Sequence, residues 1–221
     1  MALSNFTRNY GIVTSFPNTD FRVFTHNSGS AQSDKQLLVV VTMANNRNFG
    51  NATYNGVLMT QVLSKNFGGL SQKQAVFTLA NPADGNNQFI IDFSGSQFNG
   101  VSIACYTFIG CAGVGNTGIN GGSSTPNSKS LTCSNNSMIM LCGISNNAFQ
   151  NFVIDGVSKP ALYQHNVNKQ TAGALSNNVS AGSITCTSVV NSGNVTNVRV
   201  EMLEAAAPPS GNSGNFLMMF N

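Results

Sequence analysis

The amino-acid sequence predicts an all-β protein, a jelly-roll-like antiparallel β-sandwich built from two pseudo-repeated halves of about 100 residues. Short alternating or continuous apolar runs bounded by Asn, Gly and Pro recur, and no window keeps helical spacing for three turns. Asn, Ser, Thr and Gly, which disfavour helix interiors, carry most of the polar content. Residues 38–57 (LVVVTMANNRNFGNATYNGV) are echoed at 138–157 (MIMLCGISNNAFQNFVIDGV), which indicates a repeat.

The first predicted half, at 20–111, contains six expected strands. They are 21–25, 36–44, 52–63 with a bend or break at Asn55-Gly56, 74–80, 87–93 and 100–109. The turn NPADGNN, which precedes 87–93, places Pro and Gly as a tight reversal requires. Within 87–93, Phe89 and Ile91 share one face while Asp92 lies on the other, so the strand has one buried and one wet side.

The second predicted half, at 129–206, repeats that order. Its expected strands are 129–134, 137–145, 152–164 around Asp155-Gly156, 170–176, 181–190 and 196–205. Between the halves, residues 112–128 (AGVGNTGINGGSSTPNS) are rich in Gly, Ser, Asn and Thr. That composition is typical of an exposed linker.

Two strands are apolar at every position, 37–41 and 138–142. A strand with one solvated face should alternate, so continuous runs indicate burial on both sides. We expect the two halves to bury these strands against each other or under covering loops. A central strand in a thick sandwich would give the same pattern, and periodicity does not separate the two.

The two ends differ from the body of the chain. Residues 1–19 are polar with scattered aromatics and are interpreted as an N-terminal arm, and 207–221 as a flexible tail with an apolar tip. Such a tip either docks on its own domain or serves as an assembly arm on a neighbouring subunit. The tip consists of Phe216, Leu217, Met218, Met219 and Phe220.

Composition argues against several partners and cofactors. Charged residues make up 8% of the chain, and its net charge of +3 includes no basic run, so nucleic acid is not an expected partner. No apolar stretch approaches the roughly 20 residues of a membrane span, and the N-terminus has no secretory signal. The five cysteines lack metal-site spacing, so we expect buried free thiols, a reducing compartment and no cofactor.

The residues that could carry catalysis form no recognisable set, so the chain is not predicted to be an enzyme. Asp92 and Glu201 lie on strands and are the pair that a hydrolase reading would use. His26 and His165 are expected at loops or strand ends on the surface, and no GxSxG elbow accompanies them.

Sugar binding is an alternative, because Asn-rich β-sandwiches often hold glycans. The chain has no Trp, so the candidate ligand contacts near the bend of each half are Tyr54, Asn55, Tyr163 and Asp155. Packing in the core or across strands is the competing interpretation for both tyrosines.

Three strings carry a family resemblance: YNGVLM, AVFTLANPADGNNQFIIDFSG and NGVSIACYTFIG, within 36–206. They resemble a β-sandwich module of bacteriophage structural proteins and some bacterial surface proteins. The chain departs from that pattern at Met59, where a Pro-Leu sequence is usual nearby, and by lacking Trp. The shared motifs are turn and core signatures, so the resemblance implies a fold and carries over no catalytic residue. A shared fold does not by itself establish a shared function.

The function expected from these features is that of a non-enzymatic virion structural protein of a phage, a capsid decoration, spike, fibre or tail-associated subunit. Its partners would be copies of itself, other virion proteins and a host-surface glycan, with synthesis in the host cytoplasm without a signal peptide. Exposed loops at 45–52, 64–72 and 146–151 would be free to touch a host. A glycan-binding module or adhesin is the alternative.

Overall fold

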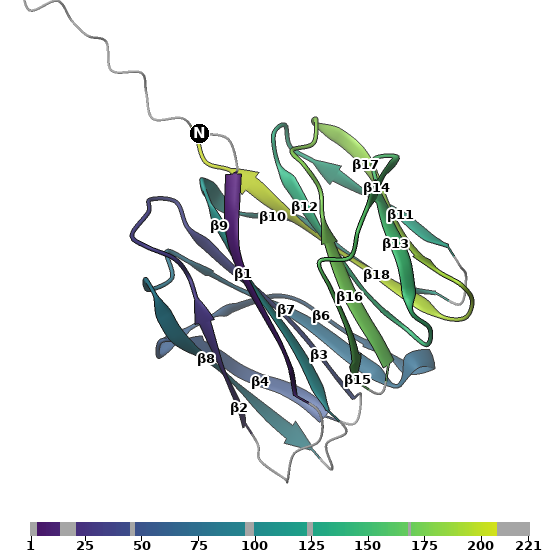
Figure 1. The fold of residues 1–221 in the computed structure, drawn as a ribbon, viewed down its shortest axis with the longest axis horizontal. Coiled ribbons are helices and arrows are strands. Elements are labelled where there is room, and N and C mark those ends of the chain that lie inside the picture. The colour runs from purple at the N-terminus through teal and green to yellow at the C-terminus, as the bar shows by residue number, and fades with distance from the viewer. Residues whose placement is uncertain are drawn as a thin grey trace, which may run out of the picture.

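The computed structural model describes residues 4–13, 21–44, 47–95, 100–122, 126–167 and 169–206. Within these ranges the chain is almost entirely β-strand, with one short 3-10 turn, η1 (Gly68–Leu70) (Figure 1). The predicted all-β class is confirmed. Among the same residues, no helix has the length and apolar character needed to cross a membrane.

The first nine strands form two antiparallel sheets, ordered β1-β9-β3-β7-β6 and β2-β8-β4-β5. Their partners nest, β1 with β9, β2 with β8, β3 with β7 and β4 with β5, as in a jelly roll, and β6 adds an edge strand. The strands are β1 (Ser4–Val13), β2 (Phe21–Asn27), β3 (Gln36–Ala44), β4 (Arg47–Tyr54), β5 (Val57–Leu58), β6 (Thr60–Phe67), β7 (Gln72–Ala80), β8 (Asn86–Gly95) and β9 (Val101–Ile109).

The other nine strands pair in the same order, β10-β18-β12-β16-β15 and β11-β17-β13-β14. Adding nine to the number of a strand in the first half gives the number of the matching strand in the second half. The order is therefore the same in both halves, while their origin by duplication stays a prediction. The strands are β10 (Cys111–Gly122), β11 (Asn127–Cys133), β12 (Met138–Ser145), β13 (Phe149–Ile154), β14 (Val157–Lys159), β15 (Tyr163–Val167), β16 (Lys169–Leu175), β17 (Gly182–Val190) and β18 (Val195–Glu204).

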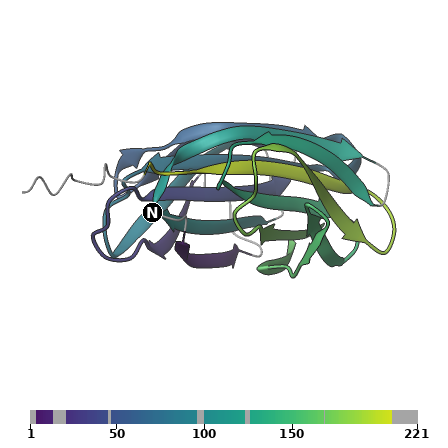
Figure 2. The same ribbon diagram turned by 90° about the horizontal axis from the view of Figure 1, so that it is seen from above.

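Three apolar cores hold the two halves, which lie side by side (Figures 1 and 2). One core fills each sandwich, and the third, here called the shared core, joins the two five-stranded sheets. Leu38 and Val40 on β3 face the shared core with Met140 on β12, whereas Leu37 and Val39 face the first sandwich. The prediction that these strands are buried on both sides, against the other half, is confirmed.

The predicted linker at 112–128 is wrong for most of its length, because β10 occupies 111–122 and pairs with β18. Three of its glycines, Gly115, Gly118 and Gly121, make room for side chains of other strands. A Cβ at Gly115 would collide with the Glu201 carboxylate, and one at Gly118 with the Arg199 guanidinium. Composition alone does not distinguish such a strand from a loop.

The predicted N-terminal arm at 1–19 also contains a strand, since β1 pairs with β9 along the edge of the first five-stranded sheet. Its polar sequence conceals the strand because an edge strand need not be apolar. The predicted tail at 207–221, with the tip Phe216 to Phe220, lies outside the described residues.

The predicted bend in each half is a tight hairpin. Asn55 and Gly56 link β4 to β5 with φ angles of 49° and 75°, and Asp155 and Gly156 link β13 to β14 with 52° and 75°. Two consecutive positive φ angles define the type I′ turn, which matches the twist of a hairpin. The echoed sequence therefore encodes the same turn twice.

Candidate functional site

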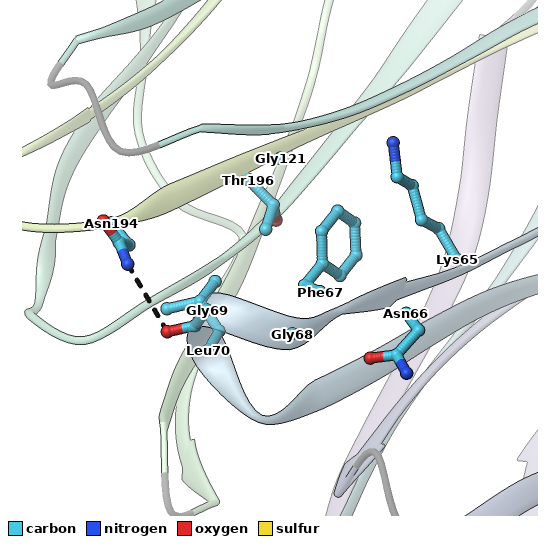
Figure 3. Close-up of a pocket in the computed structure, with 9 residues that line it drawn as sticks. All are labelled: Lys65, Asn66, Phe67, Gly68, Gly69, Leu70, Gly121, Asn194 and Thr196. Atoms are coloured by element: carbon cyan, nitrogen blue, oxygen red, sulfur yellow. Dashed lines mark hydrogen bonds between the residues drawn. The ribbon is translucent and has the colours of Figure 1, made fainter.

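A cleft of about 300 Å³ opens at the seam between the two halves (Figure 3). We call it the seam cleft. The end of β6 and the η1 turn form its first-half wall, and β10 and the start of β18 form the other. Its lining residues are Lys65, Asn66, Phe67, Gly68, Gly69, Leu70, Gly121, Asn194 and Thr196.

The floor of the seam cleft is apolar and belongs to the shared core. Phe67 and Leu70 are 5% and 3% exposed, and both pack in that core. The Phe67 ring lies against the backbone of β10 because Gly121 has no side chain, and a Cβ there would sit 2.8 Å from the ring. Gly121, which lies within the predicted linker, therefore shapes the cleft.

The rim of the seam cleft is polar and carries one charge. Lys65 is exposed and forms no ion pair with any residue that the structure describes. Asn194 donates from Nδ2 to the Gly69 carbonyl at 3.4 Å, a hydrogen bond between the two halves (Figure 3). None of the nine lining residues has a carboxylate, so the rim is electropositive.

The prediction that both histidines lie on the surface is wrong. His26 on β2 is fully buried, its Nε2 lies 2.8 Å from the Thr107 hydroxyl, and burial lowers its pKa to about 4. His165 on β15 is 5% exposed, and burial lowers its pKa as well. Both lie on strands, where the sequence did not reveal which face is inside.

His165 takes part in a buried polar contact across the seam. Its Nδ1 lies 3.3 Å from the hydroxyl of Ser102 on β9, and Thr171 donates to that hydroxyl at 3.1 Å. A Ser–His pair suggests a nucleophile, but Ser102 is only 3% exposed and does not line the seam cleft. The pair fits a structural link between the halves.

The two carboxylates of the hydrolase reading are not brought together. Asp92 is exposed on β8 of the first half, and Glu201 is buried on β18 of the second. Glu201 accepts backbone N–H bonds from Asn116 at 2.8 Å and Ser134 at 2.5 Å. Burial alone would raise the pKa of Glu201, but these N–H bonds, with smaller hydroxyl contributions, hold it below its ordinary value.

The predicted ligand contacts divide into buried and exposed pairs. Tyr54 is fully buried, and its hydroxyl donates to the His26 carbonyl at 3.0 Å. Tyr163 is 4% exposed and packs in the shared core. Asn55 and Asp155 are exposed on their turns, and Asp155 also lines a second cleft of about 220 Å³. Packing, the competing interpretation for the tyrosines, describes both.

All five cysteines are free and buried, as predicted. Burial raises the pKa of every thiol, to about 11 for Cys111 and Cys133 and about 12 for Cys142 and Cys186. Thiols with such pKa values are poor nucleophiles near neutral pH. In the part of the chain that the structure describes, no three His, Cys, Asp or Glu residues form a metal cluster.

Comparisons of the chain with protein-family models, curated proteins and solved structures found no match. No relative therefore assigns a role to the residues of the seam cleft. The three segments predicted as exposed loops, 45–52, 64–72 and 146–151, are wrong in part, because each overlaps a strand: β4, β6 and β13. The segment 64–72 contributes to the seam cleft through the end of β6 and the η1 turn.

Proposed function

We propose that this protein is a non-enzymatic structural subunit of a virion, and that it assembles with copies of itself through the edges of its sheets. The observation that carries the proposal is a set of exposed apolar side chains on edge strands. Val57 and Leu58 on β5 are 53% and 63% exposed, Val157 on β14 is 54% exposed, and Val23 on β2 is 43% exposed. All three strands are sheet edges.

An edge strand has unpaired backbone groups that can pair with another chain. Natural proteins blunt such edges with charges, and β14 ends in Lys159, but β5 consists only of Val57 and Leu58. A short apolar edge is therefore a suitable site for a neighbouring subunit to cover.

The composition supports the same function. Only 8% of residues are charged, and long charged side chains lose much conformational freedom when they are ordered in a contact. A surface of short Asn, Ser and Thr side chains loses less conformational entropy when subunits pack closely in arrays. Under this proposal the partners are copies of the chain and other virion proteins, and synthesis takes place in the host cytoplasm.

Light scattering of the purified chain over a concentration series tests the proposal. We expect assemblies larger than a monomer, and a lower assembled fraction for Leu58→Lys than for Thr185→Lys, a matched change at an exposed position of β17, which is an inner strand of its sheet. Deletion of 210–221 tests the terminal arm in the same assay. A chain that stays monomeric at every concentration, or equal behaviour of the two lysine variants, would contradict edge assembly.

Glycan binding through Tyr54 and Tyr163 has little support, since both rings are buried and neither lines the seam cleft or the cleft beside Asp155. A saccharide would have to use another part of the molecule.

A further inference from the structure

The seam cleft has the size of a site for one small ligand. Its volume of about 300 Å³ lies at the lower end of the range for small-molecule pockets, about 300–1,000 Å³. That volume suits a single sugar ring better than a nucleotide or a folded peptide segment. The two walls come from different halves, so the cleft exists only while the halves are packed together.

The charge of the cleft selects an anion of low charge. Lys65 is the one cation among the nine lining residues, and no carboxylate offsets it. Figure 3 shows the Lys65 side chain beside the Phe67 ring. A lone ammonium with no second cation suits one carboxylate better than a phosphate, which usually collects several donors.

The remaining groups suit a hydroxyl-rich ring. Asn194 supplies an amide at the rim, and its Oδ1 forms no hydrogen bond with the described residues, whereas the Asn66 side chain lies on the opposite face of β6 from Lys65 and Phe67 (Figure 3). Phe67 and Leu70 supply the apolar floor. A pyranose has this same division, with C–H groups on its face and hydroxyls at its edge.

We propose that the seam cleft binds an acidic saccharide, a sugar residue that carries a carboxylate. The carboxylate pairs with Lys65, the ring lies against the part of Phe67 that lines the cleft, and the hydroxyls bond to Asn194. This site does not depend on particle assembly, and it places saccharide recognition away from Tyr54 and Tyr163.

Titration of the full chain with glucuronate, N-acetylneuraminate and glucose, followed by backbone amide NMR, tests the proposal. We expect saturable shifts at Gly68, Gly69 and Gly121 with one or both acidic sugars, with a Kd on the order of 1 mM for glucuronate, which has about a dozen non-hydrogen atoms. Glucose should bind at least about tenfold more weakly, because it cannot pair with Lys65. Raising the salt concentration should weaken only the acidic sugars.

Two variants locate the site. Lys65→Gln should weaken acidic-sugar binding about tenfold, and Gly121→Ala should abolish it by displacing the Phe67 ring. Lys129→Gln, at an exposed lysine on β11, is the control and should bind like the parent chain. Lys65 is exposed, so its variant should fold normally.

Absence of saturable shifts with both acidic sugars would overturn the proposal. So would equal affinity for glucose, or undiminished acidic-sugar binding by Lys65→Gln. Light scattering on the same samples separates this result from the assembly proposal, because monomeric protein can still bind the sugar.

Discussion

The two halves share one strand order but fill it with different chemistry. β9 and β18 occupy the same place, between an edge strand and the strand that carries the continuous apolar run. β9 (VSIACYTFI) has no charged residue, whereas β18 (VTNVRVEMLE) buries Arg199 and Glu201. Their edge partners differ as well, since β1 has one glycine and β10 has five.

The difference shows how a sandwich accommodates buried charge. Gly118 lies directly opposite Arg199, which donates to the side-chain oxygens of Asn197 at 3.1 Å and Asn120 at 2.7 Å. The register shift in β10 leaves the Asn116 N–H free to bond to Glu201. A glycine-rich edge strand thus provides space for both side chains, a backbone donor for Glu201 and a side-chain acceptor for Arg199, while the Arg199 Nε stays without a hydrogen-bond partner among the described residues.

The largest expected loss of stability comes from substitutions in the shared core. These substitutions also test whether the two halves unfold together or separately. Leu38→Ala in the first half and Met140→Ala in the second should each lower the free energy of unfolding by about 2–5 kcal/mol, because both side chains are fully buried. Since the core joins the halves, each variant should unfold in one transition. Denaturant titration followed by two probes, one signal from each half, measures this.

Leu58→Ala is the control for the shared core, since Leu58 is 63% exposed and its loss should change stability by less than about 0.5 kcal/mol. Two separated transitions in either core variant would show that the halves are independent units.

The next effect tests the buried carboxylate of the second half. Glu201→Gln keeps the shape but replaces one acceptor oxygen with a donor, which leaves Asn116 N–H or Ser134 N–H unpaired. We expect a loss of about 3 kcal/mol, typical of removing a buried charged acceptor. Glu204→Gln, on the same strand and partly exposed, should cost far less. Equal losses, measured by urea unfolding, would contradict the assigned role of Glu201.

Most strands of both halves could be predicted because alternation and turn signals are local, although the predicted strands 52–63 and 152–164 are each divided among three strands. β1 and β10 could not, because a polar edge strand and a glycine-rich strand have the composition of loops. What identifies β10 is the pair of long side chains on β18, and their contact with it depends on tertiary pairing. Local sequence contains no signal for such a partnership.

The candidate site was even less predictable. The predicted contacts Tyr54 and Tyr163 were chosen for their chemistry near a bend, but their faces turned out to be internal. The seam cleft combines residues near 65–70, 121 and 194–196, and each segment alone has the composition of an ordinary turn or strand end. Only the packing of one half on the other makes them a site.

A smaller effect concerns acid stability, which should differ in its pH range between the halves. Burial lowers the pKa of His26 from its ordinary value of 6.5 to about 4, so the neutral form is favoured in the folded state. Its stabilising contribution is complete above pH 6.5 and is lost as pH falls towards 4. The expected loss at pH 5 is about 2 kcal/mol. Glu201, whose pKa is lowered from 4.5, should lose its contribution only at lower pH.

Urea unfolding at a series of pH values from 7.5 to 5 measures the histidine effect. His26→Gln should make the free energy of unfolding less dependent on pH. Burial also lowers the pKa of His165 at the seam, so His165→Gln should remove the part of the pH dependence that this histidine contributes. A parent profile as steep as that of His26→Gln would contradict the assignment.

The smallest effect is the sharpest comparison, because the two halves should respond identically at their matched turns. Gly56 and Gly156 both have a φ of 75°, and a Cβ would meet nothing within 4 Å at either position. Gly56→Ala and Gly156→Ala should therefore each cost about 1 kcal/mol, from backbone conformation alone. Thermal unfolding of both variants measures the difference between them. If the two substitutions lower stability by clearly different amounts, the two hairpins contribute differently to stability. That result would contradict the structural equivalence that the echoed sequence predicts.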